Sequence, residues 1–446
     1  MRTIGVTERM RGFALSSLGL LTLVAVAATL GVLTVQNETF AVLVAVAVLL
    51  VGVAVIDLST IPVLAVPATL MMLRVGGALS VSDVVLILAT GVSLLMIKGE
   101  EVRPMQPLLW SGAVYLATAL PVQLLHPYAA NVVEWLHELV LVLGSMLVGF
   151  VIGREGKAKL ALNLYVVACS VIGVAAAVVA ALSFVQTGAF QPVYLPELHK
   201  NTIGGMLAVA AVIAFARPVW LGWSRTWAYT ALVIAGVGIL AAQSRQALVG
   251  AVVGVLFVAL RPRPQTGRRS WWAWLALIPA AIYVISEVGA QLSSDNRFNS
   301  AYQRLTWYED SIDVWIQSPI FGVGLRWWYT DRFSVAFQPP NVELEVLTSV
   351  GIVGLLGFLA MFAGALWFLL RMNPVYGTVG VAVVLTRFTQ AQFDLYWVAG
   401  QASLLWIVAG ICYGVQARDR ARAITRELPP RRWSSGHRFE GKSAAS

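Results

Sequence analysis

Hydrophobic residues run along this chain in long uninterrupted stretches, broken by one long polar gap. Many stretches reach roughly 17–25 residues, which is the length an α-helix needs to cross a bilayer. Strand-like alternation is absent, so helices are the spanning elements that satisfy their own backbone groups in lipid. The pattern predicts an all-α polytopic membrane protein with about 12–14 transmembrane helices. The helices are expected at roughly 13–35, 39–57, 61–73, 81–97, 107–125, 132–152, 160–185, 202–216, 227–242, 246–260, 271–288, 343–370, 375–390 and 397–416.

Two of these stretches depart from a simple spanning helix. The stretch at 61–73 is short and contains Pro62 and Pro67, so a broken or re-entrant helix is expected there. The first stretch follows Arg2, Arg9 and Arg11, as a signal peptide would. It is long, however, and lacks a clear small-residue cleavage site, so we expect a retained helix.

Composition supports a membrane protein. Hydrophobic residues make up 59% of the 446 residues and charged residues 12%, against about 25% charged residues in soluble domains. The two cysteines, Cys169 and Cys412, both lie in apolar runs and indicate neither a disulfide framework nor a metal cluster.

Positive charges predict the orientation in the membrane. If the N-terminus is cytoplasmic, most Lys and Arg residues fall in cytoplasmic loops and in the basic tail, as the positive-inside rule requires. Both termini are then cytoplasmic, and the net charge of +9 reflects topology and tail rather than nucleic-acid binding. The basic residues left on the outer side are Arg74, Lys200, Arg245, Arg297, Arg304, Arg326, Arg332 and Arg387.

The polar gap divides the chain. It runs for about 50 residues, far longer than an ordinary connection. We expect an N-terminal transmembrane bundle at 1–288, an exoplasmic loop with short helices at 289–341, C-terminal transmembrane helices at 342–416 and a disordered basic cytoplasmic tail at 417–446. The tail combines basic residues with prolines and small polar residues, and anionic lipid would attract it.

Two outer clusters precede the loop. His199 and Lys200 stand at the mouth of a short helix, with Asn201 or Thr202 as its N-cap, and this combination favours an anion such as phosphate. The alternative is an interfacial cap with a snorkelling lysine. Arg245 lies in a tight turn between two apolar helices, where a guanidinium needs a partner or a water-filled cavity. It suits bidentate phosphate binding, or it snorkels to the headgroups.

The loop contains a third cluster. Apolar and aromatic positions between Arg304 and Trp315 fit an amphipathic helix lying on the membrane. The turn that follows contains Gly322 and Gly324. The loop's tryptophans either stack on sugar rings or anchor the loop at the interface, and the pattern alone does not choose between these roles.

These motifs, in this order, resemble a known family. The motifs are His199-Lys-Asn201 before a glycine-containing helix, Ser244-Arg245, Arg304 with Trp307, Pro319-x-x-Gly322-x-Gly324, and the run from Asn341 to Gly354. Together they resemble the O-antigen ligase / O-antigen polymerase superfamily of bacterial envelope glycosyltransferases, over about residues 60 to 416. An Arg74-Val-Gly-Gly stretch that continues to Asp83 also looks family-like.

The resemblance implies a bacterial cytoplasmic-membrane enzyme with an exoplasmic active site. Such enzymes transfer a glycan from a polyprenyl-diphosphate-linked donor to a glycan or glycolipid acceptor, with inversion and without a metal or cofactor. Arginines hold the donor diphosphate in that family, and Arg245 and Arg304 are the matching positions here. We group Arg74, Lys200 and Arg326 with them as donor-binding candidates, and Asn201, Gly322, Gly324 and Asn341 as loop and turn residues.

One departure concerns the general base. Where the family often has a histidine before the loop's final asparagine, this chain has Pro340 before Asn341, and proline cannot take a proton. The remaining candidates for the base are Glu343, Glu345 and His199. A transporter or flippase of a lipid-linked glycan is the alternative function, with Glu134, His137 and Glu138 as relay candidates or a helix cap. A scaffold subunit that has lost its base is a third.

Overall fold

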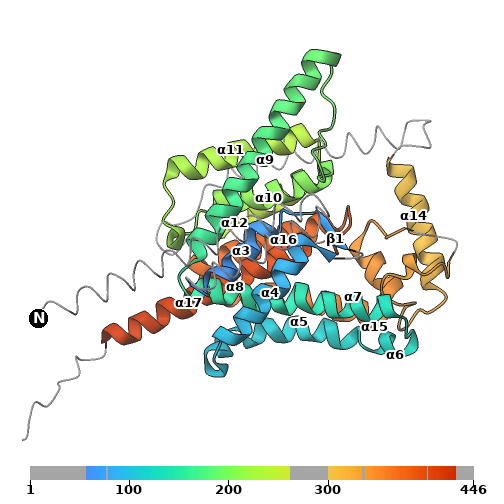
Figure 1. Ribbon diagram of the computed structural model, residues 1–446, viewed down its shortest axis with the longest axis horizontal. Coiled ribbons are helices and arrows are strands. Elements are labelled where there is room, and N and C mark those ends of the chain that lie inside the picture. Colours follow the sequence, from blue (N-terminus) through green and yellow to red (C-terminus); the bar gives the residue numbers. More distant parts are fainter. Residues whose placement is uncertain (1–56, 77–78, 262–299, 334–336, 399, 428–446) are drawn as a thin grey trace, which may run out of the picture.

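The computed structural model describes residues 57–76, 79–261, 300–333, 337–398 and 400–427. Helices make up most of the described chain, and one short antiparallel ladder is its only sheet (Figure 1). The ladder pairs β1 (Arg74–Gly76) with β2 (Leu79–Ser80). The α-helices are α3 (Thr60–Ala68), α4 (Val81–Met96), α5 (Gln106–Thr118), α6 (Pro121–Leu125), α7 (Ala129–Leu139), α8 (Ser145–Arg154), α9 (Ala158–Thr187), α10 (Lys200–Ala216), α11 (Arg225–Ala242), α12 (Arg245–Leu260), α14 (Ser300–Trp315), α15 (Val342–Arg371), α16 (Pro374–Ala391) and α17 (Gln401–Glu427). Short 3₁₀ segments cover Gly99–Met105, Val219–Leu221 and Trp327–Tyr329, and a π-helical turn, Val140–Gly144, joins α7 to α8.

The helices are those of a polytopic membrane protein. Five described spans are long and apolar enough to cross a bilayer: Gly99–Leu125, Ala129–Arg154, Ala158–Thr187, Arg225–Ala242 and Val342–Arg371. The outer faces of these spans are apolar, with Leu124 and Val185 more than 80% exposed. Such side chains suit contact with lipid tails, which confirms the all-α membrane fold predicted from the sequence.

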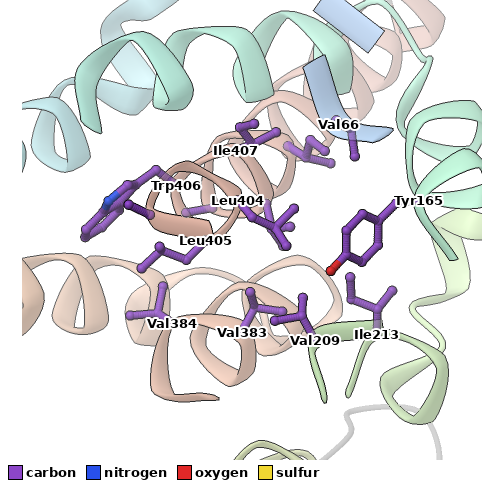
Figure 2. Close-up of a cluster of buried hydrophobic side chains, with 14 of the residues drawn as sticks. Val66, Tyr165, Val209, Ile213, Val383, Val384, Leu404, Leu405, Trp406 and Ile407 are labelled. Carbon is purple, nitrogen blue, oxygen red and sulfur yellow. The ribbon is translucent and has the colours of Figure 1, made fainter. Parts of the chain in front are cut away.

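Three groups of helices make up the body of the protein. In Figure 1, α9–α12 lie on one side and α5, α7 and α15 on the other, with α8, α16 and α17 between them. Figure 2 shows the centre of the core, where side chains of α17 such as Leu404 meet Val383 of α16 and Val209 of α10.

Small residues allow α8 and α17 to approach closely. A Cβ on Gly149 would lie 2.0 Å from the backbone oxygen of Ile407, and one on Gly410 would lie 2.2 Å from that of Met146. Gly153 and Gly414 make equally close backbone approaches, each four residues further along its helix. This is the small-xxx-small spacing by which membrane helices pack without a hydrophobic driving force.

Most predicted boundaries agree with the structure, and the exceptions are informative. The predicted helix at 61–73 is α3, which has 9 residues. At 1.5 Å per residue it is roughly 14 Å long and does not span a bilayer. α17 ends at Glu427, beyond the predicted boundary at 416, so the first part of the expected tail is helical. Helix-forming residues continue there, and Asp419 accepts a hydrogen bond from Tyr376. The helices predicted at 13–35, 39–57 and 271–288 lie outside the described residues.

Candidate functional site

Three of the predicted cations gather where two helices begin. Lys200 is the first residue of α10, Arg245 is the first of α12, and Arg304 lies in α14. The guanidinium groups of Arg245 and Arg304 lie close enough to the Lys200 ammonium to repel it. The structure thus brings together three residues that more than 100 positions of sequence separate. We call Lys200, Arg245 and Arg304 the cationic cluster.

The two helix N-termini lie side by side at this cluster. A Cβ on Gly204 would lie 2.4 Å from the Cβ of Ser244, and the Ser244 hydroxyl lies 3.5 Å from the Asn201 Oδ1. Two N-termini direct the positive ends of two helix dipoles towards the same region. Added to three cationic side chains, they make an electrostatic environment that suits an anion.

His199 has a local structural role. The predicted N-cap, Asn201 or Thr202, is wrong: α10 begins earlier, and His199 is its N-cap, where its Nδ1 accepts a hydrogen bond from the Asn201 N–H at 3.3 Å. The edge of its ring meets Tyr194. His199 therefore borders the cationic cluster and orients the first turn of α10.

Arg326 and Arg74 lie apart from the cationic cluster. The Arg326 Nε is 2.5 Å from the Glu134 Oε2, so this guanidinium already has an anionic partner. Arg74 lies exposed in β1, and none of the described contacts joins it to the cluster. The ladder in which Arg74 lies leads into Ser80, whose hydroxyl and backbone N–H form a capping box with Asp83.

A chain of charged side chains connects α4, α7 and the loop. The His137 Nε2 lies 3.1 Å from the Asp83 Oδ1, and the His137 Nδ1 lies 3.4 Å from the Glu134 Oε2. Glu134 in turn binds Arg326. Asp83, which forms the capping box with Ser80, thus positions His137. His137 in turn positions the Glu134 carboxylate, which binds Arg326.

Next to Arg326 lies a pocket with an acidic lining. Its cavity volume is about 10 Å³, which is room for about one water molecule. Three carboxylates, those of Glu134, Glu138 and Glu345, line it together with the Arg326 guanidinium. We call this the acidic pocket. Its other lining residues are Tyr115, Leu325, Trp328, Val346, Ser349 and Trp397.

The two glutamates predicted as general bases differ in their surroundings. Glu345 is 3% exposed and lines the acidic pocket, and its Oε1 accepts a hydrogen bond from the Gln338 amide at 2.7 Å. Glu343 accepts a hydrogen bond from the Gln392 amide at 2.7 Å and does not line the pocket. Asn341 caps the same helix, α15, by accepting from the Leu344 N–H. Of the two, Glu345 is the carboxylate that faces open space.

α15 is interrupted at Gly351, and the glycine turn of the loop fills the interruption. Gly351 has φ 68° and ψ −169°, which is not helical. The N–H groups of Val323 and Gly324 donate to the carbonyls of Thr348 and Ser349, both at 2.9 Å. On the other side of the interruption the N–H groups of Ile352 and Val353 donate to Pro319 and Ile320.

The glycines of this turn are required by close backbone contact. A Cβ on Gly322 would lie 2.4 Å from the Ser349 carbonyl, and one on Gly351 would lie 2.3 Å from the Ile320 oxygen. Gly322 and Gly324 also have positive φ, 73° and 109°. The Pro-x-x-Gly-x-Gly turn therefore serves to dock the loop onto α15.

The segment that links α6 to α7 holds the turn from the other side. The His126 Nε2 contacts the Gly322 oxygen at 3.1 Å, and the Tyr128 hydroxyl donates to the Leu325 carbonyl at 2.5 Å. The Asn131 Oδ1 accepts from the Leu325 N–H. Burial, and next the charge of Arg332, lower the pKa of His126 below its ordinary 6.5. The bonds from Tyr128 and Asn131 fix Leu325, the residue that precedes Arg326.

Two short connections join the cationic cluster to the acidic pocket. Gln246, next to Arg245, donates to Asp394 at 2.7 Å, and Trp397, three residues further on, lines the pocket. Three residues span at most about 11 Å. On the other side α14 carries both Arg304 and Trp307, and the Trp307 ring contacts Phe337, the neighbour of Gln338. The two regions therefore lie near each other.

Sequence reasoning alone did not identify several residues of this site. Tyr115, whose hydroxyl donates to Glu138 at 2.9 Å, comes from an apolar helix with no motif. Ser349 and Trp397 likewise have no local signal. A sequence signal does exist for Glu134, His137 and Glu138, because carboxylates at i and i+4 in an apolar helix point to the same side, into the interior. Arg387 is 3% exposed and donates to Gln390 and to the Gln401 carbonyl, inside the bundle rather than at its outer surface.

Within the described residues, no group of three or more His, Cys, Asp or Glu side chains is arranged to hold a metal ion. Residues 230–359 match the family model described as O-antigen ligase. No curated protein matches the chain. The matched segment runs from α11 through most of α15. It includes Arg245, Arg304, Arg326 and Glu345, so it covers much of both parts of the site.

Proposed function

We propose that the chain, of which residues 230–359 match the O-antigen ligase family model, transfers a glycan from a polyprenyl-diphosphate-linked donor to an acceptor at the outer face of the cytoplasmic membrane. The observation that carries this proposal is the cationic cluster, formed by Lys200, Arg245 and Arg304 at two adjoining helix N-termini. A lipid diphosphate has the charge that such a cluster stabilises, and its polyprenyl chain suits the apolar helix faces beside it.

The reaction is a displacement at the anomeric carbon of the donor sugar. An acceptor hydroxyl oxygen attacks this carbon from the face opposite the diphosphate, so the configuration inverts. The bond from the carbon to the diphosphate oxygen breaks, and the polyprenyl diphosphate leaves with the electron pair. The cationic cluster stabilises the charge that develops on it, as preorganised charges do in other transfer reactions.

Glu345 is the residue we assign as general base. It stands in the acidic pocket adjacent to the cluster, with one oxygen fixed by Gln338 and the other without a hydrogen-bond partner. That second oxygen takes the proton from the acceptor hydroxyl as the new bond forms. Glu345 is thus a substitute for the histidine that Pro340 replaces in the family pattern.

Binding of the leaving group tests the proposal. Purified protein in nanodiscs is titrated with polyprenyl diphosphate and, separately, with polyprenyl monophosphate. We expect tighter binding of the diphosphate, and at least a tenfold loss in Arg245→Ala and Arg304→Ala. Arg225→Ala is the matched control, because Arg225 is exposed at the far end of α11, roughly 27 Å of helix away from the turn before Arg245. Equal affinity for polyprenyl diphosphate in the unaltered protein and in the three variants would refute the proposed donor site.

A flippase or transporter of a lipid-linked glycan is the second candidate. The buried chain of Asp83, His137, Glu134 and Arg326 is the observation that favours it, since ionisable residues in line inside a bundle are typical of proton relays. Incubation with donor and acceptor separates the two functions. A glycosidic product supports the transferase, whereas donor movement without bond formation supports the flippase.

A further inference from the structure

A buried arginine lies beneath the cationic cluster. Arg387 of α16 is 3% exposed, and α16 packs against both α10 and α12 (Figure 1). A Cβ on Gly205 of α10 would lie 3.4 Å from the Arg387 Nη1, so the guanidinium lies directly against the backbone of this helix. Gly205 follows the first residue of α10, Lys200, by roughly 7–8 Å of helix.

Gln390 holds this guanidinium from the side of α12. Its Oε1 accepts a hydrogen bond from the Arg387 Nη1 at 2.5 Å. A Cβ on Gly250 of α12 would lie 2.8 Å from the Gln390 Cγ. Gly250 follows the first residue of α12, Arg245, by the same roughly 7–8 Å of helix. Arg387 and Gln390 therefore lie between the two helices whose first residues belong to the cationic cluster.

The hydrogen-bond partners of Arg387 are neutral. Besides Gln390, its guanidinium donates to the Gln401 carbonyl, from Nε at 3.2 Å. None of the ion pairs in the part of the chain that the structure describes includes Arg387. Asp394 lies near enough to act on its charge, but this carboxylate binds the Gln246 amide instead. Arg387 therefore brings a positive charge that no carboxylate neutralises by direct contact.

The other titratable side chains that face Arg387 are phenols. Tyr165 and Tyr396 are both fully buried, and the Tyr165 hydroxyl donates to the Met206 carbonyl at 2.9 Å. Phenols carry no charge at neutral pH and do not balance a guanidinium. A cation inside an apolar helix bundle is costly, and such residues mark sites of function. The cost has a physical reason if an anion binds at the cationic cluster above it.

We infer that Arg387 is a positioning residue of the proposed donor site, whose buried charge attracts the diphosphate to the first turns of α10 and α12 without touching it. Such a charge acts more strongly across packed apolar helices than across water, because the effective dielectric constant is lower. A guanidinium stays charged at every accessible pH, so this attraction is permanent. The inference rests on the proposed function for the identity of the anion as a lipid diphosphate.

The test separates the charge of Arg387 from its packing. Full-length protein in nanodiscs is titrated with polyprenyl diphosphate, polyprenyl monophosphate and polyprenol, which share a tail and differ in charge. We expect Arg387→Gln to weaken diphosphate binding on the order of tenfold, monophosphate binding less, and polyprenol binding not at all. Arg261→Gln is the matched control and should change none of the three affinities. Arg261 also donates to a backbone carbonyl, but it lies at the opposite end of α12, roughly 24 Å of helix from Arg245.

A second variant, Arg387→Lys, supplies a charge that pH can remove. A buried lysine loses its proton between about pH 6 and about pH 10, whereas the guanidinium of the unaltered protein stays charged. We expect the diphosphate affinity of Arg387→Lys, relative to the unaltered protein, to be near normal at the lower pH and to fall on the order of tenfold at the higher one. Should Arg387→Gln not fold, this pH dependence decides, and a relative affinity independent of pH would overturn the inference.

The outcomes distinguish the inference from the proposed function. If Arg245→Ala weakens diphosphate binding while Arg387→Gln leaves it unchanged, the inference is wrong and the donor site stands. An equal loss for all three lipids in Arg387→Gln also overturns the inference, because it would make Arg387 a packing contact only. If the unaltered protein binds the diphosphate no more tightly than polyprenol, the donor site itself is wrong, and the inference falls with the proposed function.

Discussion

Gly351 is the residue on which docking of the loop depends most, and Gly351→Ala tests it. With φ 68° and ψ −169°, Gly351 occupies a backbone region that is essentially restricted to glycine. Placing alanine there costs about 1–3 kcal/mol in backbone strain alone. The new Cβ would also stand 2.3 Å from the Ile320 oxygen and 2.5 Å from the Phe321 nitrogen, so the turn must move away from α15.

Moving the turn breaks the backbone hydrogen bonds that Val323, Gly324, Ile352 and Val353 donate across the interruption. At about 0.5–1.5 kcal/mol each, their loss adds roughly 2–6 kcal/mol. With the lower value of each contribution, the free energy of local opening falls by about 3 kcal/mol. This raises the equilibrium constant for opening on the order of a hundredfold.

Hydrogen exchange of the Val323 and Gly324 amides measures this opening directly. We expect exchange in Gly351→Ala to be on the order of a hundred times faster than in the unaltered protein. Gly236→Ala is the control, since Gly236 lies in α11 with no atom within 4 Å of an added Cβ. Unchanged exchange at the turn in Gly351→Ala would refute the docking of the loop onto the α15 interruption.

Three further predictions concern the same region. Arg326→Ala leaves Glu134 as a buried charge without its 2.5 Å partner and should destabilise the protein by about 3 kcal/mol, seen as a lower unfolding temperature; an unchanged temperature would mean the ion pair is not formed. Trp327→Ala removes a fully buried ring and should cost about 3–5 kcal/mol in thermal unfolding, with the Arg225→Ala temperature as reference. Lowering the pH should loosen the turn, because the lowered pKa of His126 means that the unfolded state binds the proton more readily. The contribution of His126 is present above its ordinary pKa of 6.5 and is lost as the pH falls through that value, so proteolysis of the loop should accelerate below it; His126→Gln should remove this pH dependence, and persistence of the dependence would contradict the assignment.

The sequence predicted the helices well because long apolar runs leave little choice of structure. The predicted stretches at 81–97, 160–185 and 343–370 agree with α4, α9 and α15 to within about three residues at each end. α17 extends further than predicted because hydropathy marks where a helix leaves the apolar layer, whereas the helix itself continues through residues such as Arg418 and Arg420.

The site was predictable only in part. Lys200, Arg245 and Arg304 were found from the sequence because cations on the outer side are exceptions to the charge rule, and the structure brings them together. The same reasoning predicted Arg326 as a donor-binding residue, but in the structure its guanidinium binds the Glu134 carboxylate. Charge and topology identify such residues as unusual, but the choice between an anionic ligand and a carboxylate partner depends on packing between α7 and the loop.

The acidic pocket was beyond sequence reasoning for the same reason. Its members come from α5, α7, the loop, α15 and the segment after α16, and most of them are ordinary residues in their own elements. Tyr115 and Ser349 acquire a role only because the interruption at Gly351 and the docked turn bring the loop over α5 and α7. The glycine turn was recognised as a motif, and its structural reason became visible only in contact with α15.

Glycan transfer by the purified protein tests the central claim most directly. The protein in proteoliposomes receives a polyprenyl-diphosphate-linked oligosaccharide and a neutral glycan acceptor, and the release of polyprenyl diphosphate is measured with the glycosidic product. We predict product in the unaltered protein and in Arg225→Ala, a loss of at least a hundredfold in Arg245→Ala and Arg304→Ala, and a similar loss in Glu345→Gln, within the range expected when a general base is removed. Transfer at the normal rate in both arginine variants, or lipid movement without a new glycosidic bond, would contradict it.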